Sequence, residues 1–165
     1  MLIVEKRIAP QARADAELVL PFEERRKARQ RTILSSGEEV ALFLDRGTIL
    51  RGGDCLLGED GRLIRVVAAP EPLMEVAASD ASLLARAAYH LGNRHCPVEV
   101  RAGALRFPAD HVLAEMLRGL GLEATPVSAP FEPEAGAYAA GHHHSGDAKH
   151  AGIIHDFAPR AMRQP

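Results

Sequence analysis

The feature that most constrains the fold of this chain is a change of pattern at Ala69-Pro70-Glu71-Pro72. Before these prolines, short apolar runs alternate with turns that contain Gly and Asp, which is typical of a small all-β unit. After them, apolar residues also recur at helical spacing between shorter strand-like runs. Two prolines in three residues stiffen the backbone and interrupt regular structure. We therefore place a domain boundary here.

The first half of the chain is predicted to consist of many short strands. Glu59-Asp60-Gly61 joins residues 55–57 to residues 62–67 as a hairpin, because Asp-Gly supplies the positive φ angles of tight turns. If residues 25–33 are extended, four basic side chains point to one face: Arg25, Lys27, Arg29 and Arg31. Such a face is either a solvated strand that discourages edge pairing or a docking surface for an acidic partner.

The second half shows the element order β-α-β-β-α-β. Strands are predicted at residues 73–76, 98–100, 104–107 and 123–127, and helices after Asp80 and over residues 108–120. This order is the ferredoxin-like arrangement. We therefore predict an α+β fold with an all-β domain at residues 1–70 and a ferredoxin-like domain at 71–139. Residues 140–165, rich in Pro, Gly, Ala and His, are predicted to form a disordered His-rich tail.

Composition limits the classes of function. The formal net charge of −2 and the absence of tryptophan argue against a nucleic-acid partner. No apolar run approaches the roughly 20 residues of a membrane span, so no membrane association is expected. Two cysteines are too few for a disulfide scaffold, and a reduced cytoplasmic protein is expected.

The stretch from Tyr89 to Pro97 closes the first helix of the second half. Gly92 or Asn93 is expected to take the left-handed conformation that ends a helix, and Pro97 blocks continuation. His95 is therefore predicted to lie on a short, stiff corner. A histidine fixed in this way is either a structural cap or a metal ligand.

The number and placement of the histidines are unusual. Five of the eight lie near the C-terminus: His142, His143, His144, His150 and His155. Neutral imidazole binds nickel, zinc and copper, and binding weakens as the pH falls through about 6.5. Because these metals take four to six ligands, His95 alone cannot form a site. A homodimer with His95 near its two-fold axis would supply two, with tail histidines completing the shell.

Three other side chains near this corner have open interpretations. His111 follows Asp110 at the start of the second helix, where capping competes with metal binding. His90 is predicted to pack on its helix face, and Cys96 is either a soft ligand or a buried thiol.

Three blocks of residues together resemble the urease accessory protein E family of nickel metallochaperones. They are Tyr89-His90-Leu91-Gly92-Asn93-Arg94-His95, then Asp110-His111-Val112-Leu113 with Met116-Leu117, and Pro130-Phe131-Glu132-Pro133-Glu134-Ala135-Gly136-Ala137-Tyr138 before the His-rich end. The resemblance covers residues 70–145 in motif and the first half in layout.

The resemblance implies a homodimer that binds Ni(II) as cargo through His95 of both subunits. It implies delivery of nickel to the urease apoprotein through an accessory GTPase complex, and an N-terminal domain similar to a chaperone peptide-binding domain. Some members have a second histidine two positions before His111. Here that position is Ala109, so only His111 of that pair is present.

Other functions stay open at this stage. The β unit with its basic strand would suit a metal-independent peptide-binding co-chaperone. Zn(II) or Cu(II) could compete for the histidines in a general divalent-metal binding and storage protein. A zinc hydrolase using His95, His111 and Asp110 lacks a credible general base, so no enzyme activity is predicted.

Overall fold

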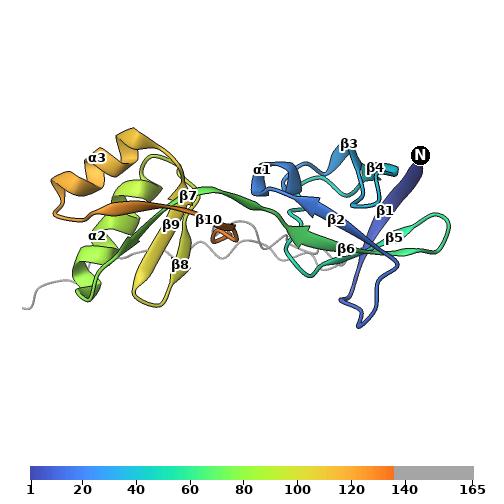
Figure 1. Cartoon of the computed structure of the whole chain (residues 1–165), viewed down its shortest axis with the longest axis horizontal. Coiled ribbons are helices and arrows are strands. Elements are labelled where there is room, and N and C mark those ends of the chain that lie inside the picture. The colour runs from blue at the N-terminus through green and yellow to red at the C-terminus, as the bar shows by residue number, and fades with distance from the viewer. Residues whose placement is uncertain (136–165) are drawn as a thin grey trace, which may run out of the picture.

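A computed structural model describes residues 1–135 of the chain. Its strands and helices form two domains that lie beside each other along the long axis of the molecule (Figure 1). The predicted tail at residues 140–165 lies outside the described residues. None of the described helices is long and apolar enough to cross a membrane.

The N-terminal domain is built on a six-stranded sheet in the order β2-β6-β5-β1-β4-β3. Its strands are β1 (Leu2–Ile8), β2 (Ala16–Leu20), β3 (Arg29–Ile33), β4 (Glu39–Phe43), β5 (Cys55–Gly58) and β6 (Leu63–Ala68). The predicted hairpin is confirmed, because β5 and β6 pair antiparallel and Gly61 adopts φ +85° in the turn. Aliphatic side chains from most of these strands, Val4, Leu42 and Leu56 among them, form the core.

The prediction that residues 25–33 form one extended basic face is wrong. Residues Phe22–Arg25 form a short helix, α1, and β3 begins only at Arg29. The carbonyl oxygen of Pro21 accepts hydrogen bonds from the N–H groups of Glu24 and Arg25, which winds the chain at this point. The Arg25 side chain is consequently turned inward and fully buried. Of the other three basic residues, which are exposed, Arg29 and Arg31 lie on β3 and Lys27 precedes it.

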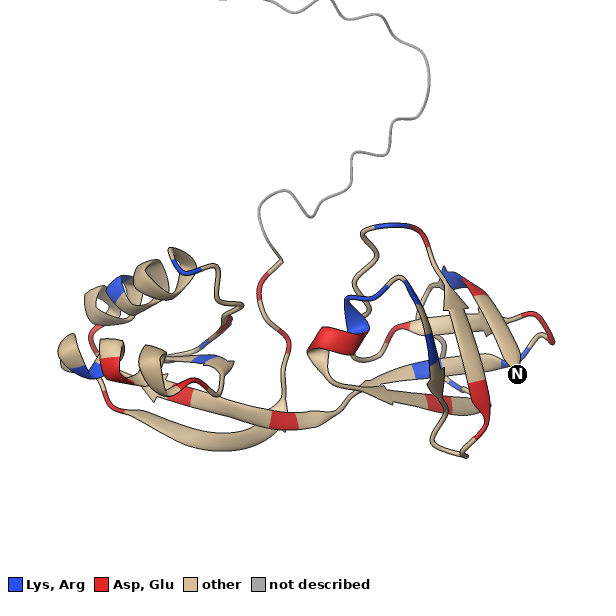
Figure 2. Ribbon diagram, turned by 90° about the horizontal axis from the view of Figure 1, so that it is seen from above, with Lys and Arg blue, Asp and Glu red and all other residues tan. Residues whose placement is uncertain are grey.

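The second domain has the predicted order β-α-β-β-α-β. It comprises β7 (Pro70–Ala77), α2 (Ala81–Gly92), β8 (Glu99–Arg101), β9 (Ala104–Pro108), α3 (His111–Gly119) and β10 (Ala124–Pro130). The sheet order is β10-β7-β9-β8. Figure 2 shows both helices on one side of this sheet, where Leu91, Phe107 and Leu117 belong to the shared core. The ferredoxin-like prediction is therefore confirmed.

Aspartates begin both helices of this domain, as the sequence predicts. Asp80 accepts hydrogen bonds from the N–H groups of Ser82 and Leu83 at the start of α2. Asp110 accepts from Val112 and Leu113 at the start of α3. Each carboxylate satisfies two N–H groups that lack helical partners and complements the positive end of the helix dipole.

The two domains meet without a flexible linker. Only Ala69 lies between β6 and β7, so a strand of one domain continues almost directly into the other. At this junction Phe22, Leu73 and Phe131 form a small separate apolar cluster. The rings of Phe22 and Phe131 meet edge to face at 5.5 Å between centroids, a favourable aromatic geometry.

Candidate metal centre

The corner that follows α2 ends in a Schellman motif. The N–H of Cys96 donates to the carbonyl oxygen of Leu91 at 3.2 Å, and the N–H of His95 donates to Gly92 at 2.9 Å. These two bonds satisfy carbonyl groups that the end of a helix otherwise leaves unpaired. The pattern places His95 at the position that usually holds a left-handed glycine. His95 has φ +55°, and among residues 1–135 no other non-glycine residue has positive φ.

The expectation that Gly92 or Asn93 would take the left-handed conformation is wrong. Asn93 is right-handed, with φ −62°, and Gly92 is the last residue of α2. The left-handed residue is instead His95, which follows both Gly92 and Asn93 in the chain. Histidine is among the non-glycine residues that tolerate this region best, yet a side chain there still strains the backbone. The strained backbone is therefore that of His95, the residue that the sequence indicates as a metal ligand.

His95 is an exposed side chain held on a fixed backbone. Within residues 1–135, no three His, Cys, Asp or Glu side chains come together in a way that could hold a metal ion. The described part of one chain therefore does not complete a metal site around His95. Further ligands would have to come from residues 136–165 or from a second molecule.

His111, the other predicted ligand in the described residues, is the exposed first residue of α3. It lies across a shallow hollow from the His95 corner. The hollow is lined by residues that flank each histidine: Arg94, Cys96, Pro97, Pro108, Ala109, Asp110, Val112 and Leu113. Asp110 is occupied as the cap of α3, so it does not serve as the general base of the hydrolase alternative.

Cys96 is poorly suited to bind a metal in this conformation. Burial, with a smaller contribution from the negative charge of Asp110, raises the pKa of the Cys96 thiol to about 11. The thiol is therefore protonated at neutral pH, whereas the metal ligand is the thiolate. His90 is half-buried, with its ring edge to face against Tyr89. The predicted ligands His142, His143, His144, His150 and His155 all lie outside the described residues.

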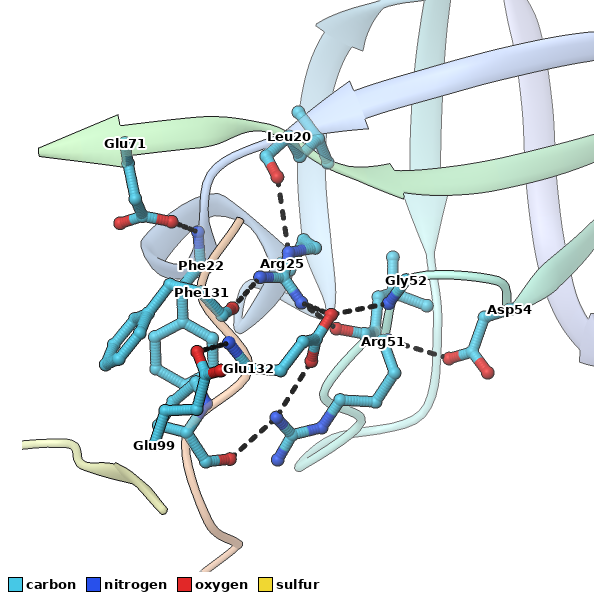
Figure 3. A network of polar contacts seen from close by, with 12 residues as sticks. Leu20, Phe22, Arg25, Arg51, Gly52, Asp54, Glu71, Glu99, Phe131 and Glu132 are labelled. Carbon is cyan, nitrogen blue, oxygen red and sulfur yellow. Dashed lines mark hydrogen bonds and ion pairs between the residues drawn. The ribbon is translucent and has the colours of Figure 1, made fainter. Parts of the chain in front are cut away.

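One polar cluster was missed by reasoning from the sequence. It surrounds Glu132, whose carboxylate contacts side chains and backbone of the N-terminal domain and whose N–H donates to the Glu99 carboxylate of the second domain (Figure 3). The block from Pro130 to Tyr138 stands out in the sequence, but nothing local in it indicates that its partner is Arg25, more than 100 residues earlier.

Residues 1–135 thus form two domains, and the second carries the exposed imidazoles of His95 and His111. The chain matches the model of the UreE urease accessory protein C-terminal domain over residues 71–158 and that of the N-terminal domain over residues 3–69. The chain therefore belongs to the UreE family of urease accessory proteins, which are chaperones of urease maturation and not enzymes.

Individual relatives agree with the family models. The chain is 51% identical to a urease accessory protein UreE of Burkholderia ambifaria, over 92% of this chain and 78% of the relative. It is 58% identical to a protein of the same name from Cupriavidus pinatubonensis, over 82% of this chain and 61% of the relative. For the Cupriavidus necator protein the identity is 57%, over 82% and 70%. The matches thus leave part of each relative uncovered.

Proposed function

We propose that this protein is a homodimeric carrier of Ni(II), with one His95 from each subunit binding the same ion. The dimer would deliver nickel to the urease apoprotein together with its accessory GTPase complex. Histidines of residues 136–165 would complete the coordination shell. Membership of a urease accessory family supports the role in urease maturation. The choice of nickel rests on the family resemblance, because imidazole sites by themselves favour copper.

The observation that carries this proposal is the geometry of the His95 corner. Two Schellman hydrogen bonds fix the backbone at His95 and therefore the direction in which its Cα–Cβ bond points. Because the ring is exposed, a second protein can approach the bound ion. A site of few fixed ligands with open positions suits transfer, since a fully enclosed ion exchanges slowly.

The surroundings of the corner support a second copy as the missing partner. Val112 lines the hollow between the His95 corner and the start of α3, and it is a large apolar residue that stays exposed. Tyr89, in the last turn of α2, is a second large apolar residue that stays exposed. Exposed apolar surface favours protein contact. A two-fold axis close to His95 would bring two such surfaces together and pair the two imidazoles.

Calorimetric titration of the intact protein with Ni(II), with the mass measured by light scattering, tests the proposal. We expect about one tight ion per dimer, lost in His95→Ala. His111→Ala is the comparison variant, because it removes the other exposed predicted ligand and leaves the His95 corner in place. Several weak ions per monomer, unchanged by His95→Ala, would contradict the shared site and favour general divalent-metal storage.

A second candidate, a peptide-binding role for the N-terminal domain, has one observation in its favour. Strand β3 is an edge strand with exposed Arg29 and Arg31, and Ile33 and Phe43 are exposed beside them. Open sheet edges can accept an added strand. Charged side chains on an edge strand also prevent unwanted pairing, so Arg29 and Arg31 could equally protect the protein against aggregation. Binding of a urease-derived peptide that persists after complete removal of metal would favour this role.

A further inference from the structure

The covalent connection between the two domains is a single residue, Ala69, which lies between β6 and β7. A hinge needs no long linker, because a few residues at the ends of elements can absorb a large change in backbone angles. Contacts elsewhere must therefore set the angle between the domains. Residues Phe131–Glu134, which we call the junction segment, follow β10 and make most of these contacts (Figure 3).

On the N-terminal side the junction segment is attached to a buried guanidinium. Arg25, whose side chain is 0% exposed, donates to Glu132 Oε1 at 2.8 Å and to the backbone carbonyl of Phe131. Arg51 donates to Glu132 Oε2 at 3.1 Å, and the N–H of Gly52 donates to Glu132 Oε1 at 2.7 Å. Both carboxylate oxygens are thus bound. Charge-assisted hydrogen bonds of this kind are strong and directional, so they define the position of the segment against this domain.

On the other side the same segment is attached through its backbone. The N–H of Glu132 donates to Glu99 Oε2 at 3.1 Å, and the N–H of Glu134 donates to the carbonyl oxygen of Val98 at 2.8 Å. Glu99 is buried, and its Oε1 atom pairs with Arg101 of the same domain at 2.8 Å. Glu132 therefore contacts one domain with its side chain and the other with its main chain.

Other polar contacts between the domains are few. Within residues 1–135, the hydrogen bonds and ion pairs that join residues 1–69 to the rest all involve the junction segment, with one exception. The exception is the N–H of Phe22, which donates to Glu71 Oε1 at 2.8 Å. The apolar contact also depends on the segment, because Phe131 packs with Phe22 and Leu73 in one cluster. Four residues after the last strand thus supply most of the contact between the domains.

The junction segment can leave this position without disturbing either sheet. The pairing of β10 with β7 ends at Pro130, opposite Pro70, so residues 131–134 contribute no strand pair. The side chain of Glu132 is 35% exposed, so water reaches the carboxylate. Partial exposure weakens an ion pair relative to one that is fully buried. Release of the segment therefore costs less than unfolding of a strand.

We propose that the junction segment is a releasable strap that sets the angle between the two domains, with Ala69 as the hinge about which they turn when it detaches. While it is attached, the free edge of β3 and the His95 corner have a fixed relative position. After release, one domain can turn toward a protein that is bound to the other. This inference goes beyond the proposed function and does not depend on nickel.

The distance between spin labels on the two domains, measured by double electron–electron resonance in the full-length protein, tests the proposal. Ser36→Cys and Ala85→Cys provide one exposed site on each domain. Cys96→Ser removes the half-buried native thiol, and Cys55 is buried. An excess of unlabelled protein restricts the measurement to distances within one chain. We expect a single narrow distance peak when the segment is intact, and loss of this narrow peak to a broad distribution in Glu132→Ala.

A matched control and a second label pair make the result specific. Glu38→Ala removes a carboxylate of similar exposure that pairs with Arg62 inside the N-terminal domain, and it should leave the interdomain peak narrow. Labels at Ser36→Cys and Glu59→Cys, both in exposed turns of the N-terminal domain, should keep a narrow peak in every variant.

A milder variant covers the case in which Glu132→Ala does not fold. Arg51→Met removes two contacts to the junction segment, those with Glu132 Oε2 and the Pro133 carbonyl, and leaves Arg25 in place. The interdomain peak should broaden in this variant too, by less than in Glu132→Ala.

Three results would overturn the inference. The first is an interdomain peak that stays narrow when the contacts of the segment are removed. The second is an interdomain distribution that is already broad in the protein with an intact segment. The third is equal broadening of the pair within the N-terminal domain, which would show that Glu132 supports the fold of that domain and not the angle. No metal is present in these measurements, so failure of the proposed nickel site is recognised separately, by nickel binding that does not change in His95→Ala.

Discussion

Replacing His95 by glycine should separate the effect of this residue on the stability of the protein from its role in nickel binding. A side chain at φ +55° crowds the following carbonyl group, at a cost of about 1–2 kcal/mol, with histidine near the lower end. Glycine removes this crowding, but it also makes the unfolded chain more flexible, at a cost of about 0.4–1 kcal/mol. We therefore expect His95→Gly to increase the free energy of unfolding by about 0.5 kcal/mol while it removes nickel binding.

His95→Ala is the comparison that isolates the backbone effect. Alanine removes the imidazole but keeps a β-carbon in the left-handed region, so it should be less stable than the glycine variant by about 0.5–1 kcal/mol. Both variants should lose nickel. His111→Gly, at the first residue of α3, should by contrast destabilise or have no effect, because glycine is a poor helix former.

Urea denaturation, followed by circular dichroism, measures these differences, and calorimetric titration measures nickel binding. A glycine variant that is less stable than the native protein would refute the reasoning, because it would show that His95 contributes packing that the exposed ring does not suggest. A glycine variant that is more stable and still binds nickel would support the backbone strain at His95. It would also show that His95 is not a nickel ligand.

Three further predictions concern the junction and Cys96. Arg25→Met should lower the free energy of unfolding by about 2–3 kcal/mol in urea denaturation, less than a fully buried pair because Glu132 is 35% exposed. Burial raises the pKa of Glu132, but hydrogen bonds from Gly52 and Arg51 and the charge of Arg25 bring it below its ordinary value of 4.5. The stability that depends on this carboxylate is thus complete above about pH 4.5 and is lost as the pH falls through the lowered pKa, and Glu132→Gln should flatten this acid limb. Cys96 should react with iodoacetamide only slowly at pH 7–8 and faster as the pH approaches 11, and Cys96→Ser should leave nickel affinity unchanged.

Local signals account for most of the fold. Asp80 and Asp110 precede apolar residues at helical spacing, and each caps a helix where the sequence predicts one. Asp60-Gly61 predicts the β5–β6 turn because the positive φ that the turn requires falls on Gly61 itself. The β-α-β-β-α-β order follows from such signals taken together.

Prediction failed where the conformation depends on which of several neighbouring residues ends a helix, or on a contact between residues distant in sequence. Gly92, Asn93 and His95 can all reverse a helix, and only the hydrogen bonds to Leu91 and Gly92 select the third. Arg25 looks like one of several surface cations until Glu132 appears opposite it, and that pairing spans most of the described chain. His95 itself was predicted as a ligand, but its strained backbone was not.

Because Arg25 pairs with Glu132, the domain boundary in the sequence does not separate two independently stabilised units. The two family models divide the chain between residues 69 and 71, yet the N-terminal domain lacks the carboxylate for its buried cation until residue 132 has been synthesised. A ribosome-bound nascent chain would therefore hold an incomplete first domain until the second is almost finished. Exchange of one domain between relatives would likewise succeed only when the incoming domain supplies the matching partner of this ion pair.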